Sequence, residues 1–294
     1  MPSNLSQSLR LLYKLTTIAF ISIVSACQYS TPIVQAPTTR NLIQTHFQQN
    51  PHKKLIPKVQ PQTKSQPQTL LPAKLHQIKH RGIQFNIITF DTRNQHLIVA
   101  DQPKGPGSIW ADAEAAAKAN HGIAAINAGF FTPEGKPLGI VISSGKKSGV
   151  NHSSSLGTGM FYHTPTGASI SRRAIWKKLS AKPPKHLLQS GPMLLENSKS
   201  IAGLSNKNSR VRSLIATDGK NHWCIGHAES CTLSQLSEAL SSLKISDFKP
   251  TTALNLDGGR SSDLWISTSV HGGSKTIRPF WNKSVRNFLI LKNN

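Results

Sequence analysis

The chain has 294 residues, of which 35 are Lys or Arg and 12 are Asp or Glu, so its formal net charge is +23. Residues 1–80 carry nine of the basic side chains and no carboxylate, which leaves 26 basic and 12 acidic groups in the rest of the chain. This balance favours anionic partners, but it decides neither the fold nor the reaction. Nucleic-acid binding is disfavoured, because only the charge supports it and no nucleic-acid-binding motif accompanies it.

The N-terminal residues have the features of an export signal. The uncharged apolar run 15–26 is shorter than the about 20 residues that a membrane-spanning helix needs, and it is typical of a signal peptide. Residues 24–27 read Val-Ser-Ala-Cys and resemble the lipobox of bacterial lipoproteins. We therefore expect a signal peptide over 1–26 and a lipid anchor at Cys27 in an exported, periplasmic protein. Gln28 favours the outer membrane. A cleaved signal peptide or a short anchor helix is the alternative, and either also implies export.

Residues 27–75 are rich in Pro, Gln, Thr and Lys and lack hydrophobic periodicity. Such a segment cannot bury enough apolar surface to offset its ordering entropy, so we expect a disordered tether. Its lysines could contact anionic lipid headgroups, although a solvated linker is the simpler interpretation. The folded domain is expected over residues 76–294.

The first elements of that domain are expected to be a hairpin and a helix. Apolar residues nearly alternate over 83–90 and recur over 97–100, on either side of a polar turn at 91–94, which predicts a β-hairpin. The alanine-rich stretch 109–119 predicts a helix that ends at Asn120.

The rest of the domain reads as strands with one clear helix. Further strands are expected at 123–126, 138–142, 213–217, 222–225, 252–256 and 288–291. The pair at 213–217 and 222–225 flanks an Asp-Gly turn and predicts a hairpin. Residues 232–243 space their leucines by three and four, which predicts an amphipathic helix with Thr232 as its N-cap. This pattern predicts an α+β fold: a mixed, largely antiparallel sheet flanked by a few helices in a single domain.

Chemistry is expected where two apolar strands end abruptly in polar residues and glycines. The first strand is followed by Asn127 and Gly129, and the second by Asp257, Gly258, Gly259, Arg260 and Ser261. Glycines let backbone N–H groups approach an anionic ligand closely. A carboxylate at position 257 could bind a sugar hydroxyl, act as base or nucleophile, or hold a metal with Asn255 or Asn127. The alternative is a plain Asp-Gly turn.

Two more charged residues are candidates. Arg212 precedes the apolar run 213–216, so its guanidinium could enter a pocket and bind phosphate. A surface position is the alternative, and Arg210 competes for the role. Glu134 lies three residues beyond the first motif and is the candidate for a second acid or base, although loop glutamates are usually solvated.

Six short motifs occur in an order that resembles the phosphodiester glycosidase family. They are N-A-G-F-F at 127–131, P-L-G at 137–139, S-G-P at 190–192, R-S-L-I-A at 212–216, T-L-x-x-L at 232–236 and L-N-L-D-G-G-R-S-S at 254–262. The resemblance spans about residues 80–292. It implies hydrolysis of a sugar from a sugar-1-phosphodiester by a secreted or envelope protein.

The resemblance also implies site residues. The matching positions are Asn127 and Gly129 in the asparagine–glycine turn, Arg212 in the family's R-T-A-I-G strand, and Asp257, Gly258, Gly259 and Ser261 in its D-G-G-G-S loop. Arg260 replaces the third glycine of that loop. It adds positive charge beside the carboxylate, where it could lower the carboxylate's pKa or bind a phosphate.

We therefore expect a hydrolase in which Asp257 is the carboxylate near the anomeric carbon and Arg212 binds the phosphate. Arg260 is a second phosphate candidate, while Asn127 and Ser261 would orient the sugar. This hypothesis requires the strand ends at 127 and 257 to converge in space. The alternative is a non-catalytic envelope lipoprotein that binds anionic glycopolymer or lipopolysaccharide.

Cofactors, partners and redox state are less constrained. The chemistry requires no cofactor, and no ligand spacing decides whether a divalent metal binds. The expected partners are a sugar-phosphate or glycopolymer substrate and the membrane through Cys27, without nucleic acid; the oligomeric state stays open. Cys224 and Cys231 could form a disulfide in an oxidising compartment or remain two buried thiols.

Overall fold

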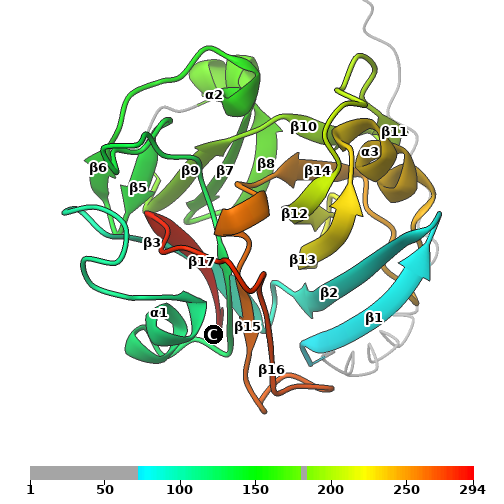
Figure 1. The fold of residues 1–294 in the computed structure, drawn as a ribbon, viewed down its shortest axis with the longest axis horizontal. Helices are drawn as coiled ribbons and strands as arrows, with labels where there is room; N and C mark the ends of the chain where they lie inside the picture. The colour runs from blue at the N-terminus through cyan, green and yellow to red at the C-terminus, as the bar shows by residue number, and fades with distance from the viewer. Residues whose placement is uncertain (1–71, 180–183) are drawn as a thin grey trace, which may run out of the picture. The chain divides into compact units, whose positions relative to one another are not determined.

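The computed structural model describes residues 72–179 and 184–294, which lie within one compact unit of the chain. The strands of these residues form three sheets, and neighbouring strands in every sheet pair antiparallel (Figure 1). The expectation of antiparallel strands with few helices is confirmed, but the strands divide among three sheets and strand residues far outnumber helical ones. The predicted signal peptide, Cys27 and the predicted tether up to residue 71 lie outside the described residues.

The largest sheet has seven strands. In spatial order they are β1 (Lys74–His80), β2 (Ile83–Asp91), β13 (His222–Cys231), β12 (Arg210–Thr217), β14 (Thr252–Asn255), β10 (Met193–Glu196) and β11 (Lys199–Ser200). Strand β1 begins two residues before the expected domain start at residue 76. Side chains alternate between two apolar layers: Ile88 and Phe90 of β2 join a central core, whereas Phe85 and Ile87 join a second cluster. Helix α3 (Leu233–Ser242) covers that second cluster.

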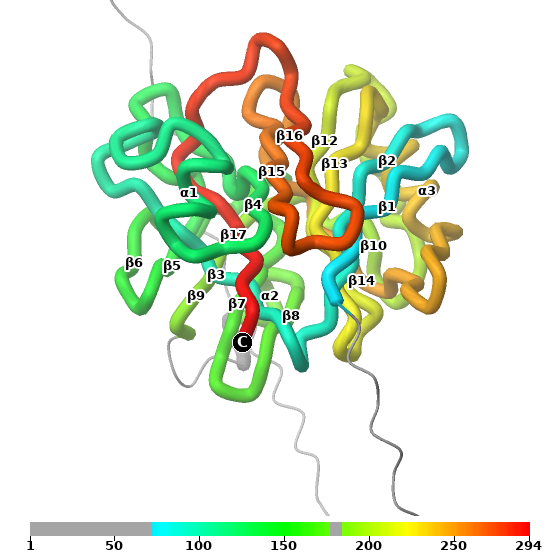
Figure 2. Tube along the Cα trace, turned by 90° about the horizontal axis from the view of Figure 1, so that it is seen from below, coloured from blue at the N-terminus to red at the C-terminus, as the bar shows by residue number. Residues whose placement is uncertain are grey.

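The second sheet has five strands and carries helix α1 (Ala113–Ala119) on its outer face. In spatial order its strands are β16 (Lys275–Ile277), β15 (Leu264–Ile266), β4 (Ala124–Asn127), β17 (Asn287–Asn293) and β3 (Gln95–Asp101). Figure 2 shows α1 beside β4 and β17. The helix starts at residue 113 rather than 109, because Asp112 is its N-cap: the Asp112 backbone is extended, and its side chain accepts a 2.9 Å hydrogen bond from the N–H of Ala115. It ends at Asn120, as predicted.

The third sheet also has five strands. In spatial order they are β6 (Lys146–Ser148), β5 (Val141–Ser143), β9 (His186–Ser190), β7 (Gly159–Thr164) and β8 (Gly167–Arg172). Strand β5 overlaps the strand predicted at 138–142 only at its end. Helix α2 (Arg173–Leu179) lies on the outer face, where the ring centroids of Trp176 and Tyr162 are 4.8 Å apart. Two short 3-10 helices, η1 (Ser155–Gly157) before β7 and η2 (Gly259–Ser261) after β14, complete the described elements.

All three sheets contribute one face to the same central core. Phe161 of the third sheet meets Trp223 of the first edge-on, with ring centroids 6.0 Å apart, and Leu289 of the second sheet belongs to the same cluster. Each sheet buries its other face under its own helix. Strands that are buried on both faces read as continuous apolar runs in the sequence, which explains the texture of 253–256 and 288–291.

The hairpin predicted from 83–90 and 97–100 is wrong, although both segments are strands. Strand β2 pairs with β1 and β13, so both of its edges are occupied, whereas β3 pairs with β17 in another sheet. The turn at 91–94 therefore carries the chain from one sheet to the next. Strand alternation reports which faces are buried and contains no information on which strand is the neighbour.

Two other predictions are confirmed. Strands β12 and β13 pair as the expected hairpin. Helix α3 has Thr232 as its N-cap, with a reciprocal capping box in which Thr232 and Gln235 each bond the other's backbone N–H. Among the helices of the described residues, none combines the length and the apolar character needed to cross a bilayer.

Candidate active site

The two glycine-punctuated strand ends meet in space. The side-chain amide of Asn127, the last residue of β4, donates a hydrogen bond of 2.6 Å to the carbonyl oxygen of Asp257, just beyond β14. The N–H of Asp257 in turn donates to the carbonyl oxygen of Ala128 at 2.9 Å. Residues 130 positions apart in the chain are thus joined by two hydrogen bonds, and the convergence expected from the sequence is present.

Asn127 and Gly129 shape the backbone and do not face a ligand. Asn127 is fully buried, and its side-chain oxygen accepts hydrogen bonds from the Ser213 hydroxyl (2.7 Å) and from the N–H of Asp263 (3.1 Å). Gly129 is buried too, and its N–H donates to Asn287 at 2.7 Å. The expectation that Asn127 orients the sugar is therefore corrected, since its amide holds together the loops that carry the site.

The carboxyl group of Asp257 is partly buried and titrates unusually. Burial raises its pKa to about 6, against the opposing effects of a hydrogen bond from the Ser261 side chain, one from the N–H of Gly258 and the charge of Lys283. The Gly258 N–H lies 2.9 Å from Oδ1 of Asp257. Ser261 was expected to orient the sugar, but its side chain bonds the Asp257 carboxyl group and does not line the cavity, so this expectation is corrected.

Asp257 is also the one acid among the described residues that is not exposed and yet forms no ion pair, since Lys283 acts on it only from beyond ion-pair distance. All twelve carboxylates of the chain lie in the described residues. Each of the others that is not exposed forms an ion pair with an arginine, lysine or histidine. Asp257 forms none with a described residue. Burial without an ion pair raises the pKa of a carboxyl group, and such a group is a candidate for chemistry.

Asp257 lines a cavity of about 400 Å³ that also contains basic side chains. Its lining residues are Phe130, Leu156, Pro192, Ser205, Lys207, Asn208, Arg210, Arg212, Leu233, Asn255, Asp257 and Gly258. Three cationic side chains thus come from the start of β12 and the segment before it, and one carboxylate comes from the end of β14. We refer to this as the Asp257 cavity. Its volume suits a small ligand, and its charges suit an anion.

Arg212 lies in this cavity, as predicted, and is held in place by the backbone. Its Nε donates to the carbonyl oxygen of Cys231 at 3.1 Å, and its Nη2 donates to that of Asn208 at 3.0 Å. Burial lowers the pKa of the guanidinium, which still stays protonated at any physiological pH. Nη1 makes no hydrogen bond to the described residues and is free for a ligand. Arg210 lines the same cavity, so the two arginines share a site.

The glycine loop has two positions where a side chain would not fit. A Cβ on Gly258 would come within 2.7 Å of the carbonyl oxygen of Val211, and Gly259 has a left-handed φ of +62°. Arg260 is not among the residues with positive φ, so this departure from the family motif causes no backbone strain. Its Nε donates to the carbonyl oxygen of Trp281 at 3.1 Å. The exposed Arg260 side chain does not line the Asp257 cavity, and the expectation of a second phosphate ligand there is corrected.

Glu134 does not reach the site. It is exposed in the turn that precedes Gly135, and a hydrogen bond from the Thr132 side chain lowers its pKa. It is absent from the lining of the Asp257 cavity. The structure therefore gives this cavity a single carboxylate, and a second acid or base at Glu134 is not supported.

The two cysteines are free, buried thiols. Cys224 and Cys231 lie seven positions apart in the same strand, β13, and at about 3.3 Å per residue they are separated by roughly 23 Å. A disulfide requires Cα atoms within about 7 Å, so the pairing considered from the sequence is excluded. Burial raises the pKa of Cys224 to about 12 and that of Cys231 to about 11.

Sequence reasoning missed Lys207 and Pro192 as lining residues. Lys207 lies in the polar stretch 205–210, whose only signal is the basic density just before β12. Asn255 was considered only as a metal partner. Its spacing of two residues from Asp257 could have shown that the two side chains share one side of an extended chain.

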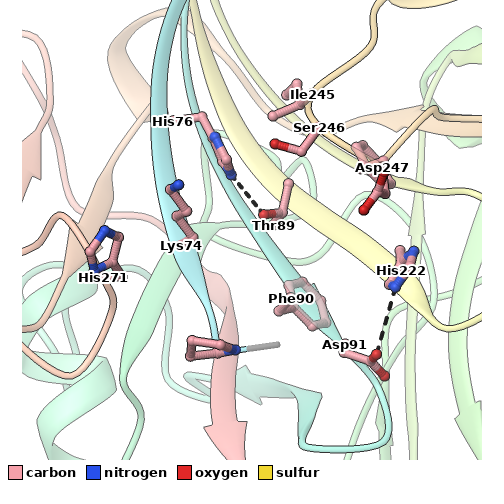
Figure 3. A pocket seen from close by; sticks show the side chains of 12 residues that line it. Lys74, His76, Thr89, Phe90, Asp91, His222, Ile245, Ser246, Asp247 and His271 are labelled. Carbon is pink, nitrogen blue, oxygen red and sulfur yellow. Dashed lines mark hydrogen bonds and ion pairs between the residues drawn. The ribbon is translucent and has the colours of Figure 1, made fainter. Parts of the chain in front are cut away.

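A second cavity of about 370 Å³ is lined by residues of β1, β2 and the start of β13 (Figure 3). Lys74, His76, Asp91, His222 and His271 are among its lining residues, and we call it the histidine cavity. Its buried aspartate is neutralised locally. Arg93 Nε lies 2.9 and 3.0 Å from the two carboxylate oxygens of Asp91, and this side-chain hydrogen bonding lowers the Asp91 pKa.

The described residues contain no group of three or more His, Cys, Asp or Glu side chains arranged to hold a metal ion. Asp257 and Asn255 supply two oxygen ligands, but the same cavity contains three cationic side chains, whose charge opposes the binding of a metal cation.

Comparisons with known proteins identify the family and the fold. The family model for phosphodiester glycosidases matches residues 120–292. No curated protein sequence shows significant similarity. Among solved structures, the catalytic domain of zebrafish N-acetylglucosamine-1-phosphodiester alpha-N-acetylglucosaminidase is similar, with a TM-score of 0.55 and 18% identity over 76% of this chain and 82% of that one.

Two further solved structures are similar. A Burkholderia pseudomallei protein has a TM-score of 0.51 at 12% identity, over 71% of this chain and 74% of that one. A Synechocystis protein has a TM-score of 0.48 at 16% identity, over 74% and 61%. At these identities the likeness to solved structures concerns the fold alone, whereas the family match covers more than half of the chain, both strand ends and the Asp257 cavity. The chain belongs to the phosphodiester glycosidase family.

Proposed function

We propose that this protein is a hydrolase that releases a sugar from a sugar-1-phosphodiester. The observation that carries the proposal is that Asp257, the partly buried carboxylate without an ion pair among the described residues, shares a cavity with Arg212, Arg210 and Lys207. Family membership and the name of the similar zebrafish enzyme support the same substrate class.

The chemistry needs one carboxylate and a binding site for phosphate. Water attacks the anomeric carbon, the bond between that carbon and the phosphate oxygen breaks, and the phosphate leaves as a monoester with the bonding electron pair. The leaving phosphate is a weak base, so it needs less protonation than the alcohol that an ordinary glycosidase with two carboxylates must expel. Arg212 and Arg210 stabilise its charge. Ionised Asp257 takes the proton of the attacking water or stabilises the positive charge that develops on the sugar.

We further propose that the enzyme works in the cell envelope, exported by the predicted signal peptide over 1–26 and held to the outer membrane, on its periplasmic side, by lipid at Cys27. This part of the proposal rests on the sequence and on the net charge of +23, which attracts anionic envelope polymers.

A substrate screen tests the proposal. The purified full-length chain is incubated with a panel of sugar-1-phosphodiesters, with and without chelator, and the released sugar and phosphomonoester are quantified. We expect turnover of at least one member, with chelator making no difference. Absence of turnover, together with retention on an anionic glycopolymer that modest salt abolishes, would instead identify a non-catalytic binding protein.

A further inference from the structure

Asn255 has a side-chain oxygen for which the protein supplies no partner. The residue is the last of β14 and is 2% exposed. Its side-chain nitrogen donates to the carbonyl oxygen of Gly191 at 2.9 Å. That carbonyl can only accept, so it fixes the orientation of the amide and leaves Oδ1 as the free end. Oδ1 is buried and has no hydrogen-bond donor among the described residues.

Asn255 is also held rigidly. Its backbone N–H donates to the carbonyl oxygen of Pro192 at 3.0 Å, and its own carbonyl oxygen accepts a 2.9 Å hydrogen bond from the Ser190 hydroxyl. Together with the bond to Gly191, three contacts to the segment 190–192 fix the residue. The amide cannot turn to find another donor without breaking them.

The residue that carries the unpartnered oxygen lines the Asp257 cavity. Asn255 and Asp257 both line it, whereas Leu256 between them is fully buried in the central core. Residues two apart in an extended chain point to the same side. Two neighbouring lining residues of the cavity therefore carry oxygen acceptors, the Asn255 amide oxygen and the carboxyl group of Asp257, when Asp257 is ionised. The donors Lys207, Arg210 and Arg212 come from a different segment.

A buried acceptor without a donor is costly, by about 1–3 kcal/mol, and it requires an explanation. The other buried side-chain atoms of the described residues that lack a hydrogen bond belong to Gln95, His227, Asp263, Arg278 and Asn287, and those of Asp263 and Arg278 form an ion pair with each other at 3.0 Å. None of these residues lines the Asp257 cavity. Asn255 is the one case in which the missing donor can be supplied by a ligand in this cavity.

We propose that Oδ1 of Asn255 accepts a hydrogen bond from a hydroxyl group of the substrate's sugar ring. This inference rests on the proposed function and adds to it the orientation of the bound substrate. The sugar ring lies at the floor of the cavity, between Asn255 and Asp257, and the phosphate points to Arg212. The enzyme discriminates against a sugar in which that one hydroxyl is replaced by hydrogen or fluorine, because neither can donate to Oδ1. Asn255 is a substrate-binding residue and takes no part in proton transfer.

The test uses the full-length chain with the methyl phosphodiesters of glucose-1-phosphate, mannose-1-phosphate and N-acetylglucosamine-1-phosphate, and with the monodeoxy analogues of each. With the native protein, one monodeoxy analogue of the preferred sugar should have a kcat/KM at least about tenfold below that of its parent. In Asn255→Ala the parent should fall by a similar factor, and the discrimination should shrink to within about threefold.

Asn221→Ala is the matched control. It makes the same substitution at an exposed asparagine outside the cavity lining. It should keep both the rate on the parent sugar and the tenfold discrimination. Uniform activity of the native protein on every monodeoxy analogue overturns the inference and needs no variant to fold.

Calorimetric binding of the same compounds separates the two proposals. Turnover without discrimination leaves the hydrolase and removes the role of Asn255. Binding with discrimination but without turnover retains the role of Asn255 and removes the hydrolase. Neither binding nor turnover of any compound overturns both.

Discussion

The two cavities differ less in size than in how each treats its aspartate. The histidine cavity, of about 370 Å³, contains Asp91, whose negative charge Arg93 neutralises from two residues away. The Asp257 cavity, of about 400 Å³, places glycines after its aspartate, and its cations come from a separate segment. The pKa of Asp91 is consequently lowered, and that of Asp257 is raised to about 6. The absence of an ion pair to the aspartate, and not the volume, distinguishes the Asp257 cavity from the histidine cavity, and a carboxyl group with a raised pKa in a cavity is a candidate for chemistry.

The largest expected effect is the loss of turnover in Asp257→Asn. The amide keeps the size of the side chain but cannot take a proton or stabilise positive charge, so kcat/KM should fall by about 1,000-fold or more. The matched control is Asp247→Asn, which alters an exposed aspartate in the lining of the histidine cavity and should leave the rate unchanged. Near-native turnover in a folded Asp257→Asn protein would show that the wrong cavity has been chosen.

The pH dependence of kcat/KM should follow Asp257. Its pKa of about 6 means that the ionised form predominates only above that pH. If the ionised form is the active one, the rate falls about tenfold per pH unit below the pKa, and is about 100-fold lower two units below it. A rate profile on the native protein, with stability monitored at each pH, measures this limb. A profile that instead falls as pH rises through 6 would assign Asp257 the role of proton donor.

Arg212→Ala should lower kcat/KM by roughly 10–100-fold, the effect of losing about 1.5–3 kcal/mol of charge-assisted hydrogen bonding to the phosphate. Arg81→Ala provides the control, since Arg81 is exposed and only 3.9 Å from Glu238 in a surface ion pair. The comparison fails if both variants keep the native rate on the same phosphodiester.

The free energy of unfolding should rise when the charge of Asp257 is removed and fall when Asp91 loses its arginine. The folded pKa of Asp257 lies above its ordinary value of 3.8, so its stabilising contribution is complete below that value and is lost as pH rises through 6. Asp257→Asn should therefore be more stable than the native protein by on the order of 2–3 kcal/mol at pH 8, and not at pH 4. Arg93→Ala should be less stable at pH 8, by about 1–3 kcal/mol, because Asp91 loses its partner. Urea denaturation at both pH values measures each difference.

The smallest expected effect is that of Arg260→Gly, which restores the family's third glycine. Because the Arg260 side chain is exposed and bonded to the Trp281 carbonyl, outside the cavity lining, kcat/KM should change by no more than about threefold. A tenfold change in either direction would place this side chain on the substrate.

Local patterns in the sequence predicted elements well and neighbours poorly. The leucine spacing over 232–243 and the cap at Thr232 depend only on nearby residues, and both are confirmed. The pairing of 83–90 depends on which distant strands occupy its edges, and that prediction was wrong. Hydrophobic periodicity reports which side chains are buried. A strand that is buried on both faces shows no periodic contrast between a buried and an exposed face.

The same limit applied within the site. The motif order predicted that Asp257 and Arg212 lie near each other, and both line the Asp257 cavity, because family resemblance encodes which segments meet. The motifs could not show that the Asn127 amide turns inward to bond Asp257 and Ser213, because the orientation of this side chain depends on the loops around it. Nor could it show that Cys224 and Cys231 share one strand, a matter of strand length.

The hydrogen bond between Asn127 and Asp257 crosses from one sheet to another, since β4 belongs to the second sheet and β14 to the first. Neither sheet alone can position the carboxylate. During refolding, recovery of enzymatic rate should therefore lag behind the return of strand structure and coincide with assembly of the sheets around Trp223. The recovery of enzymatic activity would then report the rate of the final step of folding.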